Sequence, residues 1–149
     1  MKTIILFSLS LFILSCGTQK KAAEATDVKQ TSNSNTMITA TIGEINVPTD
    51  PISISDIRVQ GNKLLIDVNY SGGCAEHSFS VVGSAMIAKS LPPIRAIQLV
   101  HNANGDQCKM MEMKTLEVDI KALAYQQEAG SKIYLTLEGW KERIEYTFE

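Results

Sequence analysis

From Met37 to the C-terminus, apolar and polar residues alternate in short runs separated by turn residues. In one such run Leu64, Ile66 and Val68 share one face of an extended chain, because successive side chains of a strand point to opposite faces. Period-two runs bounded by Gly, Pro, Asn or Ser predict β-strands. The predicted strands are Met37–Val47, Ser53–Val59, Lys63–Tyr70, Ser78–Val82, Ile94–His101, Lys114–Ile120, Ser131–Leu137 and Arg143–Phe148. The last two strands are expected to form a hairpin.

One short segment has helical character. Asp119 is placed to cap a helical turn over Ile120–Gln127, with Leu123 and Tyr125 available for packing. A series of short strands with turn signals between them predicts an all-β fold. We therefore expect a small antiparallel immunoglobulin-like β-sandwich with one short helical turn, and a small barrel is the alternative.

The N-terminus has a different pattern. Lys2 is followed by the apolar run Ile4–Leu14, which is shorter than the roughly 20 residues that span a bilayer as a helix. A basic start followed by a short apolar run is typical of a secretory signal peptide, which is removed from the mature protein. Residues 1–15 are accordingly predicted to be a signal peptide.

The motif Ile13-Leu14-Ser15-Cys16 resembles the bacterial lipobox. The resemblance implies that Cys16 receives a diacylglyceryl group, that cleavage falls before it, and that its new amino group is acylated. Two or more acyl chains anchor a protein stably, whereas one binds only marginally. Gly17 stands where an aspartate would imply retention at the inner membrane, so the resemblance favours the outer membrane. The alternative is an ordinary secretory signal with a cysteine near the cleavage site by chance.

The segment after the lipobox is polar. Residues 16–36 are rich in Ser, Thr, Asn, Gln, Lys and Ala, and Val28 is their only large apolar residue. We predict a lipidated flexible tether with an r.m.s. span of roughly 25 Å, followed by one β-sandwich domain over residues 37–149. Without the signal peptide the chain has 13 basic and 16 acidic residues and no block of like charge. This composition argues against a nucleic-acid partner. The expected partner is the membrane, through the lipid anchor, and the sequence identifies no protein or envelope partner.

Cysteine number is the next constraint. Three cysteines are unusual for an exported protein, because an unpaired thiol is a liability there. Lipidation would consume Cys16 and leave Cys74 and Cys108. In an oxidising envelope two such cysteines usually form a disulfide, which stabilises a small domain by roughly 2–4 kcal/mol.

Both histidines lie in the same two segments as these cysteines. The first segment, residues 71–77, contains Cys74 and His77, and the second, residues 101–108, contains His101 and Cys108. Within the second, Asn104-Gly105 is a strong signal for a type I′ hairpin turn. Such a hairpin would place three pairs of residues directly opposite one another. These pairs are Ala103 and Asp106, His101 and Cys108, and Leu99 and Met110.

Two interpretations of this cluster remain open. In the first, Cys74 and Cys108 form a structural disulfide and the histidines hydrogen-bond the loops. In the second, Cys74, His77, His101 and Cys108 form a tetrahedral Zn²⁺ or Cu⁺ site, with Asp106 as a spare ligand. Three methionines near Cys108 would suit copper, although ordinary strand and core filling explains them better. They are Met110, Met111 and Met113. A Cys–His nucleophile pair is a third reading, but the chain has no cysteine-protease signature.

The cluster as a whole resembles that of short lipoproteins of unassigned role. The shared residues are Gly72, Gly73, Cys74, His77, His101, Asn102, Asp106 and Cys108. The resemblance implies a common fold and cluster, and no activity comes with it. We therefore expect an envelope-anchored lipoprotein with a non-catalytic binding or structural domain, no cofactor and no enzyme activity. The alternative is a metal-binding (Zn or Cu) accessory lipoprotein.

Overall fold

The computed structural model describes residues 37–149. The signal peptide (1–15), the lipidation site Cys16 and the tether (16–36) predicted above lie outside the described residues. No helix in the described part is long and apolar enough to cross a membrane.

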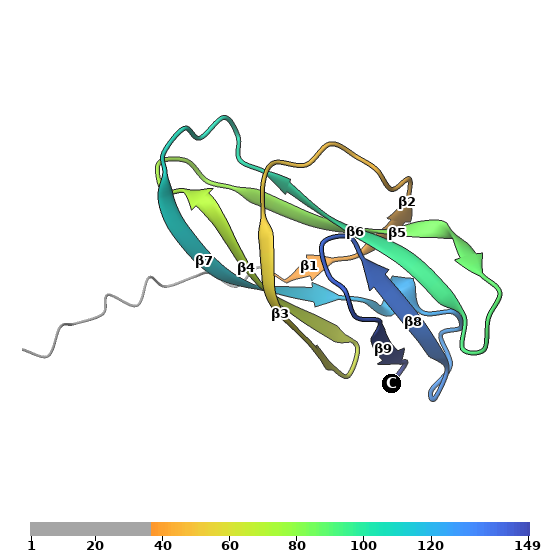
Figure 1. The fold of residues 1–149 in the computed structure, drawn as a ribbon. Helices are drawn as coiled ribbons and strands as arrows, with labels where there is room; N and C mark the ends of the chain where they lie inside the picture. Colours follow the sequence, from red (N-terminus) through yellow and green to blue (C-terminus); the bar gives the residue numbers. More distant parts are fainter. Residues whose placement is uncertain (1–36) are drawn as a thin grey trace, which may run out of the picture. The chain divides into compact units, whose positions relative to one another are not determined.

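The domain consists of two β-sheets (Figure 1). The four-stranded sheet has the order β1 (Ile38–Thr39), β7 (Met110–Asp119), β4 (Lys63–Gly72) and β3 (Ser53–Gln60). The five-stranded sheet has the order β2 (Thr41–Gly43), β5 (Ser78–Ala88), β6 (Ile94–Asn102), β8 (Lys132–Leu137) and β9 (Ile144–Thr147). The predicted all-β sandwich is confirmed, as is the hairpin of β8 and β9. The sheets are mixed and not purely antiparallel as predicted, because three strand pairs are parallel, namely β1 with β7, β2 with β5 and β6 with β8.

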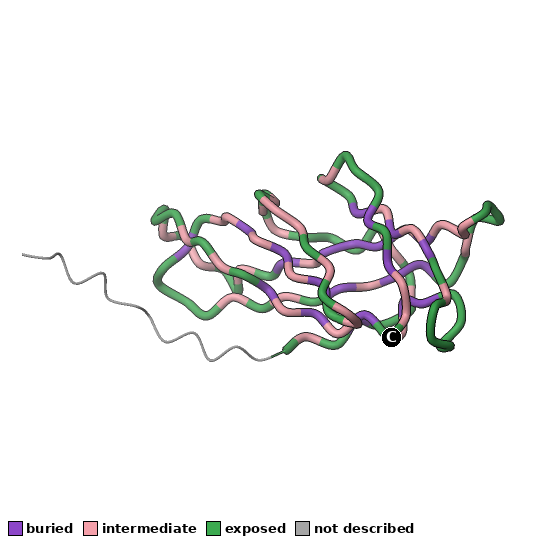
Figure 2. The backbone as a smooth tube through the Cα atoms, turned by 90° about the horizontal axis from the view of Figure 1, so that it is seen from below, coloured by how far each residue is buried: buried purple, intermediate pink, exposed green. Residues whose placement is uncertain are grey.

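The core lies between the sheets. On β4 the alternation predicted from the sequence is observed, with Leu64, Ile66 and Val68 fully buried. Leu135 and Tyr146 of the second sheet are equally inaccessible. Buried and exposed positions accordingly alternate along the strands (Figure 2). Removal of these apolar side chains from water is the main stabilising contribution to such a domain.

The N-terminal part of the domain differs from the prediction. The expected single strand Met37–Val47 is wrong, because β1 pairs with β7 in one sheet and β2 pairs with β5 in the other. The chain crosses between the sheets at Ala40, which is buried and donates its N–H to the carbonyl of Asp119 at 2.9 Å. A single run of alternating residues therefore contributes to both sheets.

The helical segment is shorter than expected. The predicted turn Ile120–Gln127 is wrong in extent, because only Lys121–Leu123 adopts a 3₁₀ conformation. The predicted cap is one residue off, because Ile120 and not Asp119 directly precedes the 3₁₀ turn, although the Asp119 carboxylate accepts the Lys121 N–H at 3.0 Å. Leu123 is buried as expected, whereas Tyr125 is about half exposed.

Candidate functional site: a buried carboxylate and two histidines beside a disulfide

The two chemically distinctive segments meet at one end of the four-stranded sheet. The antiparallel ladder of β4 and β7 ends with Gly72 opposite Met110. Continued by two residues, the same register places Cys74 opposite Cys108. The two sulfurs are bonded at 1.94 Å, and the Cα atoms are 5.9 Å apart. The disulfide therefore joins the loops at the ends of two neighbouring strands.

The predicted hairpin after β6 is only half correct. Asn104 and Gly105 do form a turn, with φ of 51° and 74°, and the Asp106 N–H donates to the Ala103 carbonyl at 3.0 Å. Both positive φ values fit a type I′ turn. The strands on either side of the turn, however, enter different sheets, so the hairpin ladder never forms.

Two predicted cross-strand pairs are consequently wrong. His101 lies opposite Phe79 of β5, not opposite Cys108. Leu99 pairs with Val81, while Met110 pairs with Gly72 in the other sheet. Hairpin turn chemistry specifies the reversal of the chain, but not which sheet the following strand joins.

Asp106 is central to the loop cluster. Its side chain is fully buried, with 0% exposed area. Oδ1 accepts the Cys108 N–H at 2.8 Å, and Oδ2 accepts the N–H groups of Cys74 and Ala75, both at 2.9 Å. These three backbone hydrogen bonds, that of Cys108 foremost, hold the pKa of the Asp106 carboxyl well below its usual range. Asp106 is therefore ionised at neutral pH.

Two histidine side chains form a chain of polar contacts with this carboxylate. His77 Nε2 lies 3.3 Å from Asp106 Oδ2, and His77 Nδ1 lies 2.8 Å from His101 Nε2. Either His77 is neutral and accepts a hydrogen bond from His101, or it is protonated and donates to both neighbours. In both arrangements His101 Nδ1 is buried without a hydrogen-bond partner among the described residues. Among the described residues, this atom is the one buried side-chain nitrogen or oxygen without a partner.

Aromatic rings and a glycine enclose the histidines. The Tyr70 ring lies 4.8 Å from that of His77, and the Phe79 ring stacks on His101 at 5.0 Å and 7°. Gly72 leaves the space that the His77 ring occupies, because a Cβ at this position would lie 2.6 Å from His77 Nε2. The ring positions are thus determined by packing as well as by hydrogen bonds.

This arrangement is chemically suited to organising loops. A buried ionised carboxylate and an imidazole resemble two parts of a catalytic triad, but the chain of hydrogen bonds ends at the buried His101 Nδ1 and reaches no hydroxyl or thiol. The sulfurs of Cys74 and Cys108 are bonded to each other. Within the described residues the cluster therefore presents no activated nucleophile.

Comparison with known proteins shows the fold alone. No known family profile matches the chain, and no curated protein is detectably similar to it in sequence. It is similar in structure to a NigD-like immunity protein from Bacteroides caccae, with a TM-score of 0.52, 22% identity, and coverage of 73% of this chain and 58% of the other. It is similar to a DUF1344 protein of unknown function from Bacteroides vulgatus, with a TM-score of 0.52, 14% identity, and coverage of 76% and 56%. The chain thus spans less than two thirds of either protein. Neither name describes an enzyme.

The structure brings the residues of the predicted Cys/His cluster together but changes their roles. Asp106, predicted as a spare metal ligand, is the residue to which the loops and His77 bond. The interpretation of the three methionines as strand and core filling is correct for the strand, because they lie on β7, but wrong for the core, because all three are exposed. Sequence reasoning also missed the enclosing rings of Tyr70 and Phe79. Their inward position follows from strand alternation, but their neighbours belong to strands whose pairing the sequence did not reveal.

Proposed function

We propose that this protein is an envelope-anchored lipoprotein whose β-sandwich serves as a non-catalytic binding domain. The observation that carries the proposal is the disulfide between Cys74 and Cys108. Structural disulfides persist in oxidising compartments outside the cytosol. Since this bond accounts for two of three cysteines, Cys16 of the lipobox-like motif is the single cysteine left for lipidation.

The fold and the cluster agree with binding. The fold is similar to that of a NigD-like immunity protein and of a protein of unknown function, and neither name describes an enzyme. The buried carboxylate and histidines give the loops at this end of the domain a fixed arrangement. Binding surfaces are commonly loops positioned by a rigid scaffold.

The anchor is tested by labelling cells with a radioactive fatty acid and fractionating them. We expect the unaltered protein in the membrane fraction with label, and the Cys16→Ala variant in the soluble fraction without label. The matched control, Cys74→Ala combined with Cys108→Ala, should retain both label and membrane association. A Cys16→Ala variant that is still labelled and membrane-bound would refute the lipoprotein proposal.

A metal-binding role of the reduced protein is the second candidate. It is favoured by one observation, that ligand atoms of Cys74, Asp106 and Cys108 all lie within 4.8 Å of one another, with His77 next to the carboxylate. Thiolates are the ligands that Zn²⁺ and Cu⁺ prefer, so this site requires the disulfide to be reduced. Native mass spectrometry with added Zn²⁺ tests it. One bound ion after reduction, lost on Cys108→Ala, supports the role, and no bound ion in either redox state refutes it.

A further inference from the structure

One side of β7 is an open edge. β4 pairs with β7 over its full length, from Lys63 opposite Asp119 to Gly72 opposite Met110. On the other side, β1 covers only Val118 and Asp119 (Figure 1). In the described part of the chain, no strand pairs with Met110–Leu116 on that side. An edge of this length presents a row of backbone donors and acceptors to another chain.

The backbone groups at this edge belong to alternate residues. The Asp119 carbonyl faces β1, since it accepts the Ala40 N–H at 2.9 Å. Hydrogen-bonding direction alternates along an antiparallel strand, and the pairing of β7 with β4 contains no register shift. The N–H and C=O groups of Met111, Met113 and Thr115 therefore point to the open side.

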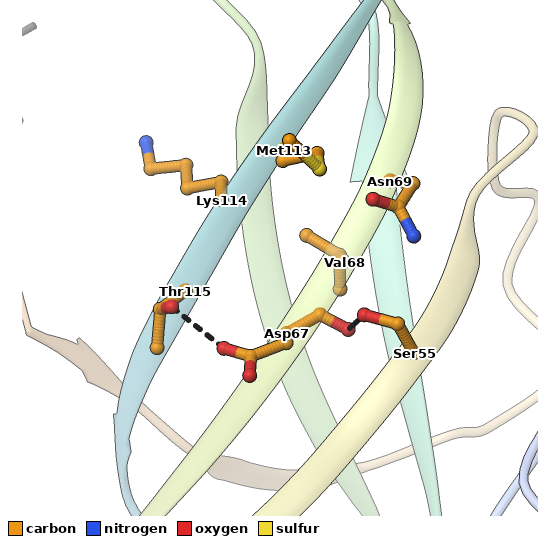
Figure 3. A pocket seen from close by; sticks show the side chains of 7 residues that line it. All are labelled: Ser55, Asp67, Val68, Asn69, Met113, Lys114 and Thr115. Atoms are coloured by element: carbon orange, nitrogen blue, oxygen red, sulfur yellow. Dashed lines mark hydrogen bonds between the residues drawn. The ribbon is translucent and has the colours of Figure 1, made fainter. Parts of the chain in front are cut away.

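The side chains of this edge divide between two faces. Met111 and Met113 lie on the outer face, with exposed fractions of 66% and 78%. Figure 3 shows Met113 on β7 beside Asn69 of β4. Glu112 and Lys114 alternate with them and lie on the inner side, where the Lys114 ammonium is 5.4 Å from the centre of the Phe79 ring. A hollow of about 420 Å³ adjoins this side of the edge and is lined by Phe79, Lys114 and others.

We propose that two copies of this chain pair antiparallel through the β7 edge, with the two-fold axis at Met113. The two-fold axis lies between the two strands and is perpendicular to the sheet. Directly opposed residues of antiparallel strands lie on the same face, so a residue at the axis must oppose its own copy and not the copy of its neighbour in sequence. An axis at Glu112 opposes two glutamates, and an axis at Lys114 opposes two lysines, both unfavourable. An axis at Met113 places Glu112 opposite the partner's Lys114, and this favourable pair occurs twice.

The length and hydrogen bonding of the edge fit the same register. With the axis at Met113, Met110 lies opposite the partner's Leu116, so the pairing ends before Val118, where β1 begins. Met113 and its copy exchange two N–H···O bonds, and Met111 does the same with the partner's Thr115. The exposed methionine side chains of the two copies become neighbours on the outer face, where flexible thioethers pack well. The pairing uses residues of the domain alone, so it is independent of the lipid anchor.

Charge reversal tests the register. Sedimentation of the detergent-solubilised full chain is expected to show a monomer–dimer equilibrium. Glu112→Lys or Lys114→Glu alone should weaken the dimer about tenfold, because each variant opposes like charges twice. The combined reversal should restore it to within about threefold. Glu142→Lys and Lys141→Glu, in the exposed loop between β8 and β9, make the same charge changes elsewhere and should have no effect.

Cysteine crosslinking in native membranes tests the axis itself without requiring charge changes. Met113→Cys places two cysteines on opposed residues, whose Cα atoms at about 5.5 Å suit a disulfide. Met111→Cys is the matched control, since its copy lies about 14 Å away along the strands. A disulfide-linked dimer of Met113→Cys alone is expected. A purely monomeric chain, equal crosslinking at both positions, or crosslinks from Met113→Cys to a different protein would overturn the proposal.

Discussion

Asp106 shows at the residue scale how one side chain organises several segments. Its carboxylate bonds the loop after β4, the loop before β7 and the His77 ring. A buried carboxylate is costly unless its charge is compensated, and here three backbone N–H groups compensate it. The same hydrogen bonds that stabilise the ionised form of Asp106 also keep the two loops adjacent. The charge of Asp106 and the conformation of the loops therefore depend on each other.

The charge of Asp106 predicts a pH dependence of stability. Because the folded-state pKa is lowered, the stabilisation is fully present above the unfolded-state value of about 3.9 and is lost as the pH falls through the folded-state pKa. We expect Asp106→Asn to be less stable than the unaltered protein at pH 7, since an amide nitrogen cannot accept a backbone N–H. Its free energy of unfolding should also decline less between pH 5 and pH 2. Urea unfolding across this range measures both effects, and parallel pH profiles would contradict the role assigned to Asp106.

Gly72 makes a steric prediction. A Cβ at this position would lie 2.6 Å from His77 Nε2, and the Tyr70 ring limits retreat of the histidine. Gly72→Ala should therefore lower the free energy of unfolding by about 1–3 kcal/mol. Gly43→Ala is the control, because its Cβ would meet Val82 at an ordinary 3.4 Å. Chemical denaturation should show a clear loss for the first variant and a change within about 0.5 kcal/mol for the second.

At the scale of elements, alternation located most strands but did not assign them to sheets. The inward face of β4 followed directly from the positions of Leu64, Ile66 and Val68. The turn at Asn104-Gly105 was also predictable from local chemistry. Period-two patterns give each strand a buried face, yet both sheets of a sandwich bury a face in the same way. The sequence pattern therefore could not predict which strands pair with β6 and β7. For the same reason it could not predict the neighbours of His101 and Cys108.

The disulfide links the loop after β4 to the loop before β7, and the effect of its removal on stability can be estimated. It closes a loop with a sequence separation of 34 residues between Cys74 and Cys108. By the loop-entropy relation, its loss should cost about 3–4 kcal/mol. In urea unfolding, the combined Cys74→Ala and Cys108→Ala variant should be less stable than the oxidised protein by this amount. Added reductant should not change the stability of the variant further. The unaltered protein should approach the same stability on reduction, and a variant as stable as the oxidised protein would show that the bond is energetically unimportant.

On the scale of the whole molecule, the connections that cross between the sheets determine the fold. The chain crosses at Ala40, after β2, after β4, after β6, and through the 3₁₀ turn Lys121–Leu123. At the last crossing, Arg95 lies buried on β6 and donates hydrogen bonds to backbone carbonyls. The acceptors are the carbonyls of Leu123 at 3.0 Å, Ala124 at 3.4 Å and Ser84. Burial lowers the pKa of Arg95 because it removes water from the charged guanidinium. The three carbonyl acceptors offset this loss of hydration.

Arg95 therefore connects the crossing segment to both β5 and β6, and its replacement should affect the entire domain. Arg95→Met keeps much of the side-chain volume but leaves buried carbonyls of Leu123 and Ser84 without their donor. Each such carbonyl carries a desolvation penalty, and we expect a loss of about 2–4 kcal/mol in the free energy of unfolding. Arg58→Met is the matched control, because Arg58 is half exposed and its ion pairs lie on the surface. Such pairs contribute about 0–1 kcal/mol. Similar losses for the two variants would show that the charge of Arg95, and not its buried bonds to the crossing segment, determines its contribution.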